Sequence, residues 1–120
     1  MPTYIALIYT AEVDWSQPEY ADGLREYVAF NEAHAAILRG GHALYPSATA
    51  ACVRVPAGTG EAVVTDGPYA ETKEALTGFM LLECADLDEA TAVAAEIPAT
   101  RYGTVEVRQL HPSLGSDGGG

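Results

Sequence analysis

Ten consecutive residues, Thr65–Glu74, concentrate groups that could carry chemistry. They supply three carboxylates, one ammonium group and one phenol, from Asp66, Glu71, Glu74, Lys73 and Tyr69. A carboxylate that lies beside another one, or in an apolar pocket, can have a raised pKa and act as a general acid or base. The stretch contains a turn signal, Asp-Gly-Pro, and is longer than the roughly two to five residues that a hairpin needs. It therefore predicts a functional loop, with a solvated acidic surface loop as the alternative.

Three polar residues elsewhere are further candidates. Asn31 and His34 lie one turn apart on the apolar side of a predicted helix. They either point into a ligand cavity or are satisfied by backbone carbonyls or by each other. In a cavity, His34 would be the natural proton carrier near neutral pH. His42 follows this helix and is expected to be a loop histidine at the edge of a cleft.

The last predicted strand, Thr104–Leu110, carries a pair of opposite charges. Val105 and Val107 are expected to face the helices, because successive side chains of a strand alternate between its faces. Glu106 and Arg108 then share the other face. They form either a structural ion pair that sets the register of a dimer, or the polar floor of a cleft in which Arg108 binds a carboxylate or enolate oxygen.

The strands and helices that must position these groups can be predicted from the pattern of residue types along the chain. Strands are predicted where β-branched and aromatic residues gather, at Thr3–Thr10, Ala48–Val55, Glu61–Thr65, Thr77–Ala85 and Thr104–Leu110. The second and third of these form a hairpin that leads into the Asp66 loop. Both faces of the first strand are largely apolar, which predicts a central strand covered on two sides.

Two helices are predicted between the strands. The first begins with Ser16 as N-cap and Glu19 reaching back to it, and runs to about Arg39, where Gly40-Gly41 stops it. Its wide apolar arc suggests that it also packs against a lid or a partner subunit. The second begins at Asp86, with Glu89 three residues later, and ends before Pro98. The resulting order, β-α-β-β-β-α-β, predicts an α+β sandwich of the split βαβ type with one added strand.

Four segments of the sequence resemble the YCII-related family, in its branch named for an Asp-Gly-Pro-Phe (DGPF) motif. They are Asp66–Glu74, with Tyr69 in place of the Phe, Gly78-Phe79, Asp86–Ala90 and Val105–Arg108. The likeness runs from Tyr4 to Leu110. It implies a ferredoxin-like βαββ(β)αβ sandwich that forms a dimeric α/β barrel, with a cleft in each protomer.

The other branch of that family has a histidine–aspartate pair proposed as catalytic. In this chain Ile97 stands at the aspartate's position before Pro98, and His34 does not stand at the matching distance from Gly40-Gly41. The histidine–aspartate pair of that branch is therefore not expected in this sequence in its usual form.

The length and net charge of the chain limit the number of domains and the classes of partner that it can have. The 120 residues predict one domain over residues 1–112 and a flexible tail over residues 113–120. Seventeen acidic against six basic residues give a net charge of −11, which disfavours nucleic acid and anionic membranes as partners. No apolar run reaches the roughly 18 residues of a membrane-spanning helix, and the N-terminus lacks a basic leader, so we expect a cytoplasmic protein.

Familiar cofactor signatures are missing from the sequence. It has no phosphate-binding loop, dinucleotide fingerprint, nucleophile elbow or zinc-ligand spacing, so we expect neither a cofactor nor a metal. Cys52 and Cys84 are expected to be buried free thiols, with a disulfide as the alternative.

These observations predict a homodimeric, cofactor-free enzyme that acts on a small molecule as an isomerase, lyase or cyclase. Asp66 and His34 are the acid and base candidates, and the predicted substrate-binding residues are Tyr69, Glu71, Lys73, Glu74, Arg108, Asn31 and His42. The alternative is a non-catalytic module that senses a metabolite or docks to a protein, with a link to transcription regulation, because members of the branch resemble domains joined to transcription initiation factors. A third alternative is that the Asp66 loop only holds the two protomers of the dimer together.

Overall fold

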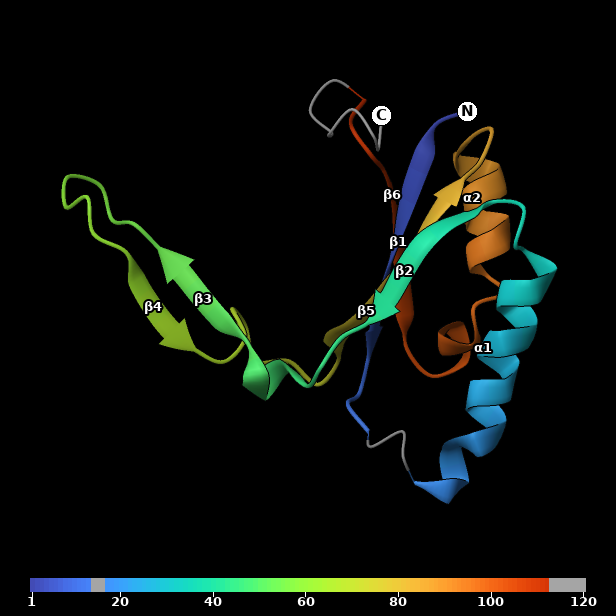
Figure 1. Ribbon diagram of the computed structural model, residues 1–120, viewed down its shortest axis with the longest axis horizontal. Helices are drawn as coiled ribbons and strands as arrows, with labels where there is room; N and C mark the ends of the chain where they lie inside the picture. The colour runs from blue at the N-terminus through green and yellow to red at the C-terminus, as the bar shows by residue number, and fades with distance from the viewer. Residues whose placement is uncertain (14–16, 113–120) are drawn as a thin grey trace.

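Helices lie on one side of an antiparallel sheet, and a two-stranded hairpin extends from the other side (Figure 1). The computed structural model describes residues 1–13 and 17–112. The elements, in chain order, are β1 (Thr3–Thr10), α1 (Ala21–Ala33), β2 (Leu38–Ala43), β3 (Ala51–Arg54), β4 (Val63–Asp66), β5 (Ala75–Glu83), α2 (Leu87–Ala94) and β6 (Thr104–Gln109). Short 3-10 turns precede α1 and β3 and follow α2. The mixed α+β class predicted from the sequence is confirmed.

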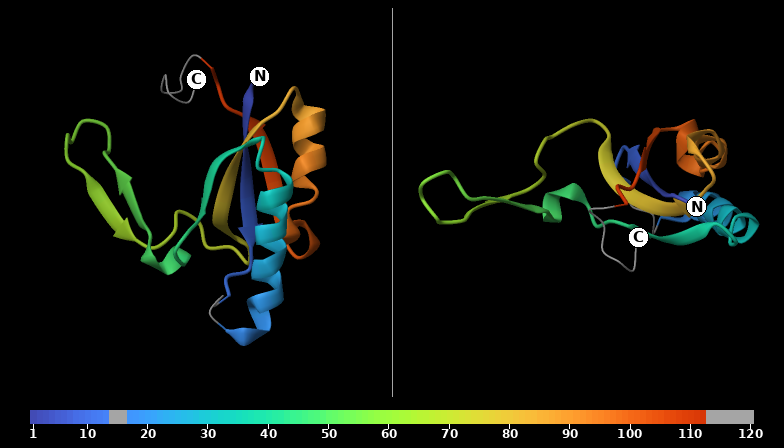
Figure 2. Two further views of the ribbon diagram at one scale, coloured as in Figure 1. Left: turned by 45° about the vertical axis from the view of Figure 1, so that its right-hand side comes forward. Right: turned by 90° about the horizontal axis from the view of Figure 1, so that it is seen from above.

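The main sheet has the strand order β2-β5-β1-β6, with every neighbouring pair antiparallel. β1 is a central strand, as predicted, and its burial alternates along its whole length. Tyr4, Ala6 and Ile8 are buried beneath the helices, whereas Ile5 and Leu7 lie half-buried on the opposite face. We call that opposite face, which the helices do not cover, the open face (Figure 2).

The core lies between the helices and the covered face of the sheet. Tyr4 is opposite Leu82 in β5, and Ile8 is opposite Val105 in β6, so their side chains share this face. The buried core contains Tyr4, Ala6, Ile8, Phe30, Leu82, Cys84, Ala90, Val93, Ala94, Ile97 and Ala99. Both cysteines are free, and Cys84 is buried whereas Cys52 is half-buried.

The first helix is shorter than the sequence predicts. α1 ends at Ala33 rather than near Arg39, and a turn follows in which the amides of Ile37 and Leu38 donate to the His34 carbonyl, at 3.0 and 3.1 Å. The chain then reverses and pairs with β5 as the edge strand β2, which the sequence reading missed. Apolar residues continue at helical spacing through Ile37 and Leu38, so the sequence pattern predicts a helix where the structure has a strand. The predicted N-cap, Ser16, lies outside the described residues.

Gly40 and Gly41 are part of β2 and do not stop a helix. Their φ angles are +144° and +156°, in a region that side chains disfavour. A Cβ atom on Gly41 would lie 2.6 Å from the Phe79 carbonyl oxygen. The glycines thus let the edge strand follow β5 closely, through a register shift between Leu38 and Gly40.

The second helix begins as predicted. The Asp86 carboxylate accepts a hydrogen bond from the Glu89 amide at 2.8 Å, and the Glu89 carboxylate accepts one from the Ala85 amide at 2.8 Å. α2 ends at Ala94, and Pro98 opens the following 3-10 turn.

The predicted hairpin is present, with shorter strands than expected. β3 and β4 form a two-stranded sheet of their own, in the register Cys52 opposite Thr65 and Val53 opposite Val64. Figures 1 and 2 show this hairpin, residues 51–66, standing away from the main sheet on the side opposite the helices. We call it the arm. None of the helices within residues 1–13 and 17–112 is long and apolar enough to cross a membrane.

Candidate ligand-binding site

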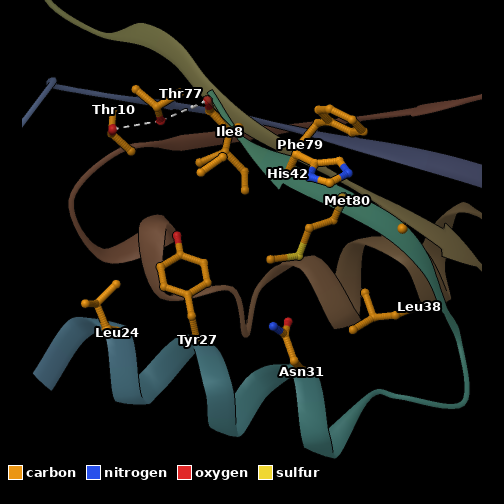
Figure 3. Close-up of a pocket in the computed structure, with 14 residues that line it drawn as sticks. Ile8, Thr10, Leu24, Tyr27, Asn31, Leu38, His42, Thr77, Phe79 and Met80 are labelled. Atoms are coloured by element: carbon orange, nitrogen blue, oxygen red, sulfur yellow. Dashed lines mark hydrogen bonds between the residues drawn. The ribbon is translucent and has the colours of Figure 1, made fainter. Parts of the chain in front are cut away.

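A cavity of about 610 Å³ lies between α1 and the β2–β5 side of the sheet (Figure 3). Apolar side chains from α1, β1, β2 and β5 form most of its wall. The lining residues are Ile8, Thr10, Leu24, Tyr27, Asn31, Leu38, Gly40, Gly41, His42, Ala43, Thr77, Gly78, Phe79 and Met80. No Asp, Glu, Lys or Arg is among them.

Two polar side chains of α1 point across this cavity toward the sheet (Figure 3). They are Tyr27 and Asn31, which stand one helical turn apart on one face of the helix. Burial is the main cause that raises the pKa of Tyr27 well above that of an ordinary phenol, and the neighbouring Tyr102 adds to it. Tyr27 is therefore neutral throughout the physiological range, and its hydroxyl can donate a hydrogen bond.

A threonine pair forms the polar end of the cavity. The hydroxyl oxygens of Thr10 and Thr77 are 3.0 Å apart, and Thr10 also donates to the Ala11 carbonyl at 3.0 Å. The Thr77 hydroxyl lies 3.4 Å from the Ile8 carbonyl. These hydroxyls are largely satisfied within the chain, and the Tyr27 hydroxyl also contacts the Tyr102 hydroxyl and the Ala99 backbone, so Asn31 is the polar group most available to a ligand.

His42 belongs to the wall of the cavity, but its ring stands on the other side of β2 from Met80 (Figure 3). It is opposite Phe79 in the sheet, and the two ring centroids are 6.2 Å apart. The imidazole thus lies at the edge of the sheet, on its open face.

The structure places His34 outside the cavity, although Asn31 is only three residues away. His34 is the C-cap residue of α1; its ring centroid is 4.7 Å from that of Phe30. Its Nε2 lies 3.2 Å from a carboxylate oxygen of Glu96, just beyond α2. His34 therefore links the ends of the two helices through a side-chain contact that neither of the two alternatives for this residue predicted.

The Asp66 loop forms a second, shallower hollow of about 440 Å³ at the base of the arm. Asp66 and Glu71 line it, together with Ser47 and Thr72. All four side chains are half-buried or exposed, which favours the solvated reading over an apolar pocket for the carboxylates. Tyr69 is 92% exposed and contributes nothing to either hollow.

The other residues predicted for the loop are dispersed. Lys73 is exposed and makes no ion pair within the described part of the chain. The Glu74 carboxylate accepts a hydrogen bond from the Thr104 hydroxyl at 3.4 Å, and its backbone carbonyl accepts one from Thr72. In the described residues, no three His, Cys, Asp or Glu side chains gather closely enough to hold a metal ion.

Arg108 lies on the open face with Glu106, and Val105 and Val107 pack toward the helices, as the strand pattern predicts. The Arg108 Nε and a Glu106 carboxylate oxygen are 4.0 Å apart. In the register with β1, Arg108 is opposite Ile5 and Glu106 is opposite Leu7, two residue pairs away. Arg108 is thus separated from the helix–sheet cavity by the sheet itself.

Among the residues predicted for the site, the structure therefore brings only Asn31 and His42 to the walls of the larger cavity. The sequence reading missed Tyr27, Thr10, Thr77 and Met80 as lining residues. Tyr27 could have been found, because it precedes Asn31 by four residues and so must share its helix face.

Comparisons with known proteins agree with this architecture. The solved structure of 5-chloro-2-hydroxyhydroquinone dehydrochlorinase (TftG) from Burkholderia phenoliruptrix AC1100, in complex with 2,5-dihydroxybenzoquinone, is similar, with a TM-score of 0.50. The alignment covers 91% of this chain and 93% of that one at 15% sequence identity, so the likeness concerns the fold.

A curated relative is the uncharacterized protein R00369 of Rhizobium meliloti (strain 1021). It is 49% identical over 71 residues, which are 56% of this chain and 54% of that protein, so the match spans about half the length of each. The model of the YCII-related domain matches residues 3–113, nearly the whole chain. The chain therefore belongs to the YCII-related family.

Proposed function

We propose that this protein binds an uncharged, largely apolar small organic molecule in the helix–sheet cavity. The observation that carries the proposal is the cavity itself. Its volume of about 610 Å³ falls in the range typical of ligand sites, roughly 300–1,000 Å³, and such sites combine apolar walls with a few placed polar groups. Here Tyr27 and Asn31 are those groups.

No charged side chain lines the cavity among the residues that the structure describes, and this favours an uncharged ligand. A buried carboxylate or phosphate would find no Lys or Arg among the lining residues, and an unpaired buried ion is strongly disfavoured. The net charge of −11 further opposes the approach of anions. A carbonyl or phenol oxygen suits the site, because the Asn31 amide can donate to it, and the Tyr27 hydroxyl can do so by exchanging its contact with Tyr102.

The chemistry that we propose is cofactor-free acid–base catalysis of the isomerase, lyase or cyclase class. Neutral Tyr27 can stabilise an oxygen that gains negative charge by donating a hydrogen bond in place of its contact with Tyr102, whereas its raised pKa opposes full transfer of the proton. The fold supports this proposal only by analogy, since a similar fold carries a dehydrochlorinase. The proposed roles of Asp66 and His34 are harder to combine with this cavity, because neither residue lines it.

We also propose that the chain belongs to the DGPF branch of its family and forms a ferredoxin-like homodimer. The strand order β2-β5-β1-β6 and the two helices on one face support the ferredoxin-like assignment. The open face supports the dimer, because its half-buried side chains include Ile5, Leu7 and Phe79. A second copy would cover them, and Arg108 of each copy could then meet Glu106 of the other.

A matched pair of tryptophan substitutions on α1 tests the binding site. Leu24 lines the cavity and is 47% exposed, whereas Val28 does not line it and is 55% exposed. Titration calorimetry would measure the affinity for coumarin, 2-naphthol and the anion 2-naphthoate. We expect a neutral probe to bind, Leu24→Trp to weaken it at least tenfold, and Val28→Trp to leave it unchanged.

Two results would contradict the proposal: preferred binding of 2-naphthoate, or equal effects of the two substitutions. If neither neutral probe binds to the wild type, the panel widens to small lactones and enolisable ketones, and failure of all of them rejects the site.

One observation favours a non-catalytic module as the second candidate. Among the described residues that line the cavity, only Tyr27 and His42 have a side chain that could act as an acid or base, and the His42 ring stands on the far side of β2 from Met80. Liquid chromatography of each bound compound after prolonged incubation separates the two candidates. Conversion that falls at least tenfold in Tyr27→Phe supports the enzyme, and unchanged ligand supports the sensing module.

A further inference from the structure

We propose that the arm, residues 51–66, is a dimer contact whose valine face packs on a second copy of this chain. The inference rests on the homodimer proposed above and adds a surface to it. It begins from the isolation of the arm, whose strands β3 and β4 pair with no other strand in the described part of the chain. A two-stranded hairpin is at best marginally stable in water, so this one needs a surface to pack on.

The arm exposes a cross-strand pair of apolar side chains. Val53 and Val64 are directly opposite each other and are 63% and 60% exposed. Val55, two residues beyond Val53, is also mostly exposed. Opposed residues of a hairpin share one face, so Val53 and Val64 form a single apolar patch, which we call the valine face. An apolar strand face that is left uncovered is a typical site of association.

The position of the arm indicates a second copy as the occupant. Figures 1 and 2 show that the arm extends on the side of the sheet opposite the helices, which is the side of the open face. A copy that docks on the open face therefore arrives beside the arm. In a twofold dimer each copy presents one arm and accepts the other, so two unpartnered apolar surfaces of this chain are covered together.

In the same arrangement, the basic residues of one copy are complementary in charge to the acidic surface of the other. Four of the six basic residues form ion pairs within the chain, with Asp22, Glu26, Glu83 and Glu106 as their partners. The other two, Arg54 and Lys73, make no ion pair within the described part of the chain. Arg54 lies on the arm, and Lys73 in the loop at its base. The rest of the chain is strongly acidic, so a second copy offers carboxylates to both cations.

Two lysine substitutions in β4 test the inference. Val64→Lys places a charge on the valine face, and Val63→Lys places the same charge on the opposite face of the same strand. Sedimentation velocity over a concentration series would give the dimer dissociation constant. We expect Val64→Lys to raise it by about 100-fold, since both arms of the dimer lose a buried valine, and Val63→Lys to change it by less than about threefold.

Hydrogen exchange of the wild type provides a measurement without substitution. Amides of residues 51–66 should exchange more slowly at protein concentrations above the dissociation constant than below it. A wild-type dimer with equal effects of the two substitutions, or with concentration-independent exchange in the arm, would overturn the arm contact and leave the dimer in place. A wild type that is monomeric at all concentrations would overturn both.

Discussion

Substitution of Gly41 by alanine tests how tightly the edge strand fits against β5. A Cβ atom at this position would lie 2.6 Å from the Phe79 carbonyl oxygen and 3.1 Å from the Met80 Cα atom, and both neighbours are backbone. The φ angle of +156° adds conformational strain. Relief of the contact requires β2 to move, which also alters the cavity wall that Gly41 helps to form.

The expected cost can be worked from these two effects. A positive φ costs a non-glycine residue roughly 1–2 kcal/mol. An overpacked backbone contact adds about 1–3 kcal/mol. The sum, roughly 2–5 kcal/mol, is a large part of the 5–15 kcal/mol that stabilises a typical domain, and corresponds to a fall in Tm of roughly 8–20 °C.

Gly58 provides the matched control. It also has a positive φ, +81°, but a Cβ atom there would meet nothing within 4 Å. Gly58→Ala should therefore cost only about 1 kcal/mol, from conformation alone. Calorimetric or circular-dichroism melting of both variants makes the comparison. If Gly41→Ala is as mild as Gly58→Ala, the close approach of β2 to Phe79 is refuted.

Two further predictions concern the anchoring of loops and helices. Asp86→Ala removes the N-cap of α2 and should lower the free energy of unfolding by about 1 kcal/mol in urea denaturation, and Asp86→Asn should lower it by much less. Glu12 accepts hydrogen bonds at 2.6 Å from the Ser47 hydroxyl and from the Ser47 amide, and these bonds lower its pKa below the ordinary value of 4.5. Because the folded-state pKa is the lower one, the contribution to stability is complete above pH 4.5 and is lost as the pH falls through the lowered value. Glu12→Gln should therefore be less stable than the wild type at pH 6, with the difference shrinking toward pH 3; a difference that is constant with pH would contradict this.

Strands and caps that depend on local patterning could be predicted from the sequence. β1 matches its predicted bounds because alternation and β-branched residues coincide over Thr3–Thr10. The Asp86 cap and the faces of Glu106 and Arg108 follow from equally local rules. The YCII-related family was also predicted from short motifs, and the domain match confirms it.

The errors arise where tertiary contacts outweigh local signals. Ile37 and Leu38 continue the helical periodicity, but pairing with β5 draws the chain into an edge strand. The shortened helix places His34 against Glu96, and the cavity could not be foreseen because β2, one of its walls, was not expected. The predicted catalytic role of Asp66 depends on surroundings that no sequence pattern specifies, and it stays a prediction, as does the cytoplasmic location.

The two methionines of the chain allow the most direct test of ligand binding in the helix–sheet cavity. Met80 lines the cavity, whereas Met1 is exposed at the N-terminus and serves as an internal control. In protein labelled with ¹³C at the methionine methyl groups, titration with coumarin or 2-naphthol should shift the Met80 resonance saturably and leave the Met1 resonance in place. A probe that binds in calorimetry without shifting Met80, or that shifts both resonances alike, would contradict the assignment of this cavity as the ligand site.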